Sequence, residues 1–171
     1  MNSDQKVVAV GAASGVATMV VAVALLTYLL PAPTTFSDTI PERLAYALGA
    51  NVFAILPFLI MLMTVGNSRF FSDAIDPTQH AETQSQEVDG RVADNTLQQN
   101  FIFLVATLAL STVVPYNYLQ VIGACAIVFV IARSAFWFGY RLHPLYRAPG
   151  MSSTAYMNLF IILYVLYQLA S

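Results

Sequence analysis

Charged side chains are scarce in this sequence. Asp, Glu, Lys and Arg together make up 9% of the residues, against about 25% in soluble globular domains. The apolar fraction is 58%, which exceeds the roughly 45–50% of soluble domains. A soluble fold would have too few charges to cover its surface, so the sequence predicts that lipid surrounds much of the chain.

Basic residues, cysteine and histidine are also few. Lys and Arg total seven in a chain of net charge −2, which is too few and too scattered for binding to nucleic acid. Cys125 is the only cysteine, so an intramolecular disulfide and a zinc-finger spacing are excluded, and its apolar neighbours indicate a buried, inert thiol. His80 stands alone in a polar stretch, and a lone loop histidine is seldom a metal ligand. We therefore expect no metal site.

Long apolar runs, in contrast, are abundant. A helix needs about 20 apolar residues to cross a bilayer. Five runs qualify or nearly do: Val7 to Leu30, Leu44 to Val65, Arg91 to Val114, Leu119 to Tyr140 and Ser152 to Ala170. The first is longer than the h-region of a signal peptide, about 7–15 residues, although a signal peptide is the alternative. We predict an all-α transmembrane helical bundle with a kink at Pro57, and a solvated, flexible connector from Asn67 to Gly90.

The distribution of cations predicts the orientation. With five spans, six of the seven basic residues fall on the side of the N-terminus: Lys6, Arg69, Arg91, Arg133, Arg141 and Arg147. Only Arg43 falls on the other side. Because positive charge favours the cytoplasmic face, we expect a cytoplasmic N-terminus, in a bacterial inner membrane or a eukaryotic endomembrane.

The third run opens with polar residues at helical spacing. Arg91, Asn95 and Gln98 share one helix face, and Gln99 and Asn100 extend the polar character about one turn deeper. Unpaired polar groups facing lipid are costly, so these need the bundle, a second subunit or a ligand as partners. The alternative is a snorkelling arginine followed by ordinary interhelical hydrogen bonds. The GxxxG of Gly11 and Gly15 is weak evidence of a helix contact.

The end of the fourth run carries a basic and aromatic cluster. Arg133 and Tyr140 share a face, and Pro144 and Pro149 are expected to end the helix and leave Arg147 in a tight Arg-Ala-Pro-Gly turn. The alternative is an ordinary interfacial belt, which also consists of Arg, Trp and Tyr. Arg141 fits such a belt. Four cations are expected at the same membrane depth: Arg69, Arg91, Arg133 and Arg147. They would repel one another without an anion among them. Asp89, Asp94 or a ligand could supply that anion.

Together these motifs resemble the superfamily of membrane-associated proteins in eicosanoid and glutathione metabolism (MAPEG). The resemblance rests on Arg91–Asn95–Gln98, on Arg133 followed by Tyr140, and on Arg147-Ala-Pro-Gly, and it covers residues 44–171. The extra first span, with Pro41-Glu-Arg-Leu-Ala-Tyr-Ala-Leu and Val-Phe-Ala before Pro57, resembles the five-span, mattrin-like branch. We therefore predict an N-terminal helix and connector in residues 1–43 and a four-helix MAPEG-like domain in residues 44–171.

The resemblance implies a homotrimer that binds glutathione at subunit interfaces near the cytosolic face. Arg147 would stabilise the thiolate, Arg69 would reach in from a neighbour, and the other binding residues would be Arg91, Asn95, Gln98, Arg133 and Tyr140. The enzyme would be a transferase or peroxidase acting on a lipophilic electrophile that arrives laterally past Phe136 and Trp137. Gln98 replaces a glutamate of the family and Phe136 a tyrosine. These departures favour the alternative, which is a non-catalytic mattrin-like protein acting through partners or on membrane trafficking. A transporter or channel fits the sequence least, because no span carries a charged residue near its middle.

Overall fold

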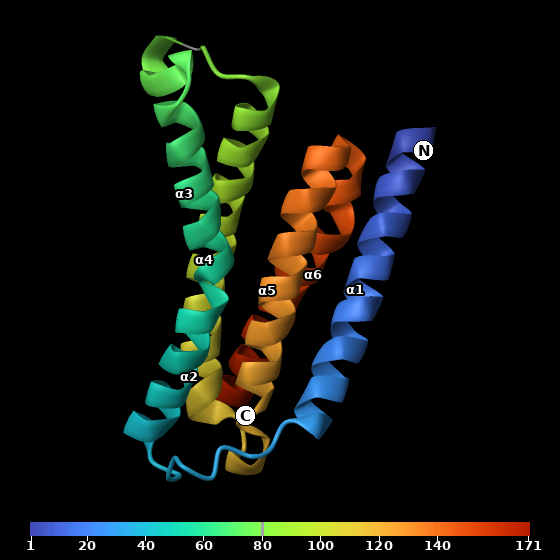
Figure 1. Cartoon of the computed structure of the whole chain (residues 1–171). Coiled ribbons are helices and arrows are strands. Elements are labelled where there is room, and N and C mark those ends of the chain that lie inside the picture. Colours follow the sequence, from blue (N-terminus) through green and yellow to red (C-terminus); the bar gives the residue numbers. More distant parts are fainter. Residues whose placement is uncertain (80) are drawn as a thin grey trace.

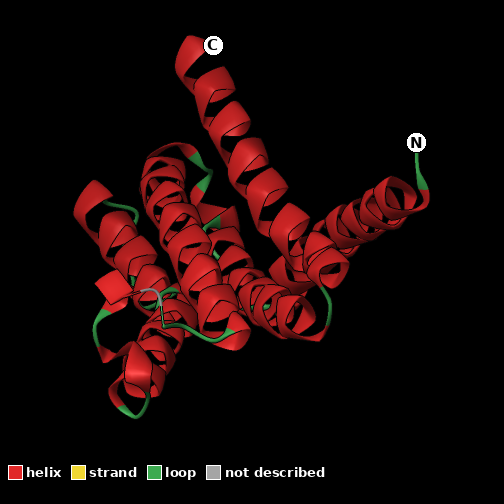
Figure 2. Cartoon of the chain, turned by 90° about the horizontal axis from the view of Figure 1, so that it is seen from above, coloured by secondary structure: helices red, strands yellow, loops and turns green. Residues whose placement is uncertain are grey.

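The computed structural model describes residues 1–79 and 81–171, and these residues are all-α (Figure 2). His80 lies outside the described residues. The α-helices are α1 Ser3–Leu29, α2 Ile40–Ala54, α3 Leu56–Phe70, α4 Gln84–Val113, α5 Val121–Leu142 and α6 Ala148–Ala170. Short 3-10 helices cover Asp73–Ile75, Pro77–Gln79, Tyr116–Tyr118 and Pro144–Arg147.

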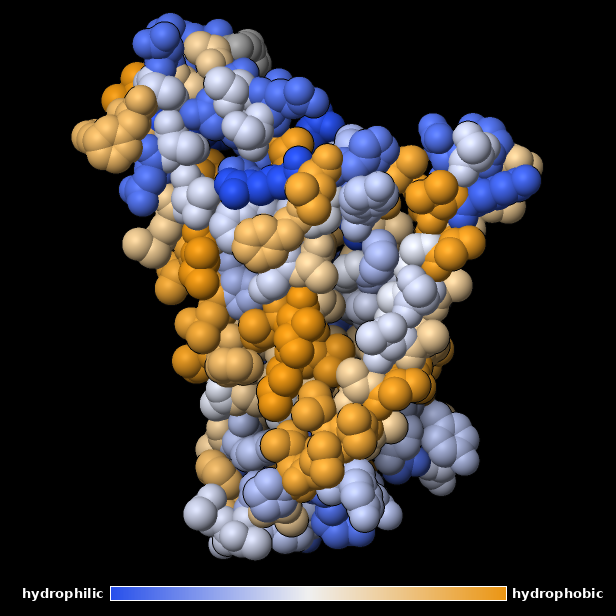
Figure 3. Space-filling view, turned by 45° about the vertical axis from the view of Figure 1, so that its right-hand side comes forward, coloured by the Kyte–Doolittle hydropathy of each residue, from blue (hydrophilic) through white to orange (hydrophobic). Residues whose placement is uncertain are grey.

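Five helical stretches of the described chain are long and apolar enough to cross a bilayer, which confirms the predicted architecture. They are Ser3–Leu29, Ile40–Phe70, Gln84–Val113, Tyr116–Leu142 and Pro144–Ala170. At 1.5 Å per residue, each exceeds the roughly 30 Å of membrane hydrocarbon. On the face shown in Figure 3, hydrophobic side chains cover the middle of the molecule and hydrophilic ones gather at both ends.

The spans pack as one bundle. α6 contacts α1, α5 and α4, and α4 also contacts α2 and α3. The N-terminus lies at the same end as the connection from α3 to α4, and the C-terminus lies at the opposite end (Figure 1). The first span packs directly on α5 and α6, whereas the division at residue 43 stays a prediction.

The second span is broken at Pro57, as predicted. α2 ends at Ala54 and α3 begins at Leu56, with Pro57 in the first turn of α3. Proline has no N–H to donate and its ring clashes with the preceding turn, so the helix is interrupted there. Near the break, the Asn51 amide of α2 donates to the Thr107 hydroxyl of α4 at 2.8 Å, which ties the bent span to its neighbour.

α1 meets α6 through small residues. A Cβ atom added to Gly15 would lie 2.2 Å from the Pro149 carbonyl oxygen, so glycine is required at this position. The Ser152 hydroxyl donates to the Ala12 carbonyl at 3.0 Å, and the Ser153 hydroxyl donates to the Gly15 carbonyl at 2.8 Å. Small residues and hydroxyl donors are what join helices within lipid. The GxxxG pattern of α1 thus marks a close helix contact.

The stretch from Asn67 to Gly90 differs from the expected flexible connector, because most of it is helical. α3 continues to Phe70 and α4 begins at Gln84. A capping box starts α4: the Thr83 hydroxyl accepts from the Gln86 N–H, and the Gln86 side chain accepts from the Thr83 N–H. The Thr-Gln-Ser-Gln sequence carries this helix-start pattern, so a local signal for the longer helix was present.

The turn expected before the last span is also different. α5 ends at Leu142, Pro144 opens a 3-10 helix that runs to Arg147, and Pro149 lies in the first turn of α6. Proline is favoured in the first turn of a helix, where its missing N–H would have no partner anyway. The two prolines therefore begin helices, and the Arg-Ala-Pro-Gly segment enters α6 without an open turn.

Arg43 closes the other end of the bundle by capping α4. Its Nη1 donates to the Ser111 carbonyl at 3.0 Å, its Nη2 donates to the Val114 carbonyl at 2.8 Å, and its Nε pairs with Asp38 at 2.8 Å. The last carbonyls of a helix lack intrahelical partners and carry partial negative charge. A buried guanidinium satisfies two of them at once and joins α2 to α4.

Candidate functional site

Basic and aromatic side chains alternate along one face of the last turns of α5. The Arg133 guanidinium lies 4.2 Å from the centre of the Phe136 ring, and the Phe136 and Tyr140 ring centres are 6.0 Å apart. Arg147, in the 3-10 helix that follows, donates to the Tyr140 hydroxyl at 2.9 Å, and its guanidinium carbon lies 4.8 Å from the ring centre. Helical spacing of three and four residues aligns Arg133, Phe136 and Tyr140, and the 3-10 helix after α5 brings Arg147 to Tyr140.

Arg133 is fully buried, with 0% of its surface exposed. Its Nη1 donates to the Asn95 side-chain oxygen of α4 at 3.0 Å, whereas Nε and Nη2 have no hydrogen-bond partner among the described residues. Burying a cation without a carboxylate is costly, and the face of Phe136 offsets part of that cost. Arg133 therefore keeps two donors that a further acceptor would satisfy.

The other predicted site residues are not gathered around Arg133. Arg91 and Gln98 lie on the exposed side of α4, and Arg69 forms an ion pair with Glu82. Contacts that join predicted residues within the described chain are Asn95 with Arg133 and Tyr140 with Arg147. The roles of all seven residues toward a ligand stay predictions.

A buried carboxylate, Asp89, joins α4 to α5 at the same end. It accepts from the Trp137 indole N–H at 2.8 Å and from the Arg141 Nε at 2.7 Å, and it forms an ion pair with the Arg141 Nη2. Asp89 is only 3% exposed, so these donors replace the water that it lost. The expectation of a solvated Asp89 is wrong, because α4 already includes Asp89 and aligns it with α5. Arg141, which fits an interfacial belt, also pairs with this carboxylate.

The pairing of the remaining charges also differs from expectation. Asp89 pairs with Arg141 and with none of the four cations that were expected to need an anion. Asp94, the other candidate, is exposed. Among those four cations, Arg69 forms an ion pair with Glu82.

Phe136 and Trp137 do not line a lateral route from the bilayer, which corrects the expected path of substrates. Both are buried in a hydrophobic cluster with Met61, Val65 and Val92. The indole of Trp137 is held by its hydrogen bond to a carboxylate of α4. These aromatic side chains therefore pack α3, α4 and α5 together.

Gln99 and Asn100 find their partners inside the chain. The Asn158 amide of α6 donates to the Gln99 side-chain oxygen at 3.0 Å and to its backbone carbonyl at 3.2 Å. The Asn100 amide donates to the Thr96 carbonyl at 3.0 Å. The bundle thus supplies a partner for Gln99 from α6, which was one of the alternatives that the sequence left open, whereas Asn100 bonds within α4 and the Asn158 side-chain oxygen has no partner among the described residues.

Five apolar spans with a basic, aromatic-rich end define a multi-pass α-helical membrane protein. The chain is distantly similar to Transmembrane protein 79 (mattrin) of Mus musculus, a MAPEG-related membrane protein, with 24% identity over 140 residues. The match covers 82% of this chain and 36% of that protein, so the chain spans about a third of the length of the curated relative. No known family profile and no solved structure matches the chain.

Proposed function

We propose that this chain is a non-catalytic, mattrin-type membrane protein that acts through partners in the membrane or in membrane trafficking. Similarity to Transmembrane protein 79 over 82% of the chain supports this proposal. The observation that carries it is the pairing of cations inside the chain: Arg141 with Asp89, Arg69 with Glu82 and Arg147 with the Tyr140 hydroxyl. Cations paired in this way have fewer donors left for a bound thiol, and the Arg141–Asp89 pair also joins α4 to α5.

Gln98 supports the same proposal. It stands where the resembled superfamily has a glutamate, and it is exposed on α4. A neutral amide oxygen accepts a hydrogen bond with roughly half the strength of a carboxylate. A site built on Gln98 would therefore hold the amino group of glutathione weakly.

Arg133 favours a second candidate function, which is glutathione-dependent transfer or peroxidation of a lipophilic electrophile. Its Nε and Nη2 lack acceptors within the described chain, and a carboxylate of glutathione would satisfy both if α4 and α5 opened around this fully buried side chain. In this reading the site forms between the subunits of a homotrimer, so that the exposed side of α4 with Arg91 and Gln98 faces a neighbouring subunit.

The ultraviolet absorbance of the glutathione thiolate separates the two functions. A free thiol with a pKa of about 8.5 is mostly protonated at neutral pH, and a neighbouring guanidinium lowers that pKa. Detergent-purified protein is titrated with glutathione into the millimolar range and assayed with a small lipophilic electrophile. The non-catalytic proposal predicts no thiolate signal and no turnover.

The matched variants are Arg147→Ala and Lys6→Ala. Both residues are exposed cations at the same end of the bundle, but only Arg147 belongs to the row of contacts on α5. Arg141→Ala is unsuitable as a control because it unpairs the buried Asp89. A thiolate signal that disappears in Arg147→Ala and persists in Lys6→Ala would contradict the non-catalytic proposal and support the enzyme.

A further inference from the structure

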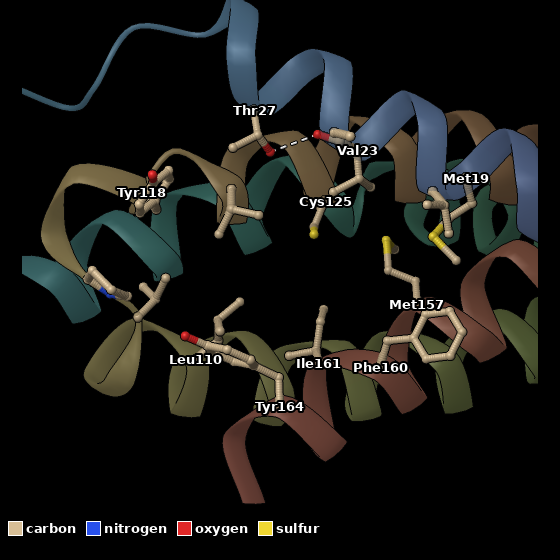
Figure 4. Close-up of a pocket in the computed structure, with 15 residues that line it drawn as sticks. Met19, Val23, Thr27, Leu110, Tyr118, Cys125, Met157, Phe160, Ile161 and Tyr164 are labelled. Atoms are coloured by element: carbon tan, nitrogen blue, oxygen red, sulfur yellow. Dashed lines mark hydrogen bonds between the residues drawn. The ribbon is translucent and has the colours of Figure 1, made fainter. Parts of the chain in front are cut away.

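A cavity of about 600 Å³ lies between α1 and α6, toward the end of the bundle that holds Arg43 (Figure 4). The end of α4, the turn after it and the start of α5 complete its walls. Figure 4 shows the side chain of Cys125 from α5 and those of Met157 and Ile161 from α6 extending into the same space. This cavity is separate from the row of contacts at Arg133.

The lining is apolar and contains no charged residue. The hydroxyl of Thr27 is already used, since it donates to the Val23 carbonyl at 2.7 Å. Two tyrosines, Tyr118 and Tyr164, bring phenol groups to the lining, and Tyr118 lies in the turn between α4 and α5, where the chain reaches a membrane surface. A ligand with a charged headgroup would meet no counter-charge here, whereas a neutral hydroxyl could pair with a phenol.

The dimensions fit the apolar body of a lipid. From Met19 to Thr27 the cavity follows nine residues of α1, which span roughly 12 Å of helix. Its volume of about 600 Å³ lies within the roughly 300–1,000 Å³ of small-molecule pockets. The apolar body of one lipid therefore fits between α1 and α6.

The cavity is accessible from the bilayer. Val20 of α1 and Phe160 of α6 line it, yet 49% and 44% of their surfaces are exposed. The two helices meet tightly at Gly15 and Pro149, and beyond that contact they form opposite walls. A lipid can therefore enter sideways between α1 and α6.

We infer that this cavity binds a neutral lipid with an apolar body and a single hydroxyl group, with the hydroxyl directed toward Tyr118. Long-chain alcohols and sterols both have this chemistry. The site depends on α1, so the first span supplies a ligand wall as well as a membrane crossing.

A photoactivatable long-chain alcohol with a diazirine in the middle of its chain tests the inference. Purified protein is reconstituted in phosphatidylcholine vesicles, irradiated with the probe and mapped by peptide mass spectrometry. We expect labelling to concentrate on residues that line the cavity. Val20→Trp should reduce it about tenfold, the loss expected if binding weakens by about 1.4 kcal/mol, because the indole fills the opening.

Val21→Trp is the matched control, since Val21 is the next residue on α1, is 65% exposed and does not line the cavity. Ala24→Trp, one turn further along the same wall, is a second blocking variant in case Val20→Trp folds poorly. Displacement of the probe by unlabelled hexadecanol or by cholesterol supports the inference and identifies the apolar body that fits. Equal displacement by palmitate, equal labelling of the Val20→Trp and Val21→Trp variants, or labelling spread evenly over the lipid-facing surface would overturn it.

Discussion

The Asp89 carboxylate is almost completely buried, and it accepts hydrogen bonds from the Trp137 indole and the Arg141 guanidinium. Without the carboxylate, the indole N–H would remain buried and without an acceptor, which carries the full cost of desolvation. Arg43 has the corresponding role at the other end, where it satisfies two carbonyls of α4. At the scale of single residues, these polar contacts fix α4 against its neighbours.

Asp89→Ala should lower the free energy of unfolding by about 2–3 kcal/mol, because it removes charge-assisted hydrogen bonds to two side chains. Denaturant unfolding in detergent micelles measures this. Asp94→Ala is the control, since Asp94 is exposed on the same helix and should change stability little. Equal losses in the two variants would mean that Asp89 does not hold α4 to α5.

Helical periodicity placed Arg133 and Tyr140 on one face because seven residues make two helical turns, and Phe136 lies between them on that face. Sequence reasoning missed the partners of Asp89 and the capping by Arg43 for one reason. Trp137 and Arg141 lie 48 and 52 residues from Asp89, and the carbonyls that Arg43 caps lie 68 and 71 residues away. Helical periodicity relates residues of one helix and carries no information about which helices meet.

At the scale of helices, the small residues of α1 set how closely it approaches α6. Gly15→Ala should destabilise the protein by about 1–3 kcal/mol, because the new methyl group would overlap the Pro149 carbonyl oxygen and force the helices apart. Gly11→Ala should cost less, since its added Cβ would lie 3.3 Å from Ala148. The thermal unfolding midpoint in detergent measures both.

Ala13→Leu is the control for these glycine variants, because Ala13 is exposed on α1 and a larger side chain there would meet lipid. It should leave the unfolding midpoint nearly unchanged. An unfolding midpoint of Gly15→Ala as high as that of Ala13→Leu would show that α1 and α6 are further apart than described.

The apolar runs predicted all five spans because the thickness of the bilayer sets the length of each crossing. Boundaries outside the hydrocarbon were less accurate. α4 begins at Gln84, seven residues before the expected Arg91, because polar helical turns give no hydropathy signal. Only the capping pattern at Thr83 and Gln86 marked the earlier start.

At the scale of the whole molecule, the chain alternates between the two ends of the bundle. The N-terminus and the connections from α3 to α4 and from α5 to α6 lie at one end, and the C-terminus lies at the other (Figure 1). The expected homotrimer remains a proposal that depends on the superfamily resemblance, because Gln99 and Asn100 have partners within one chain.

The central claim, five membrane crossings with the arginine-rich end in the cytoplasm, determines where the candidate site and the lipid cavity lie in the membrane. Reporter fusions at Ser171 and in the connection near Thr83, with a third after Thr34 between α1 and α2, test it directly. The account predicts that the Thr83 reporter is cytoplasmic and that the Ser171 and Thr34 reporters lie on the opposite side. Finding the Ser171 and Thr83 reporters on the same side would contradict it.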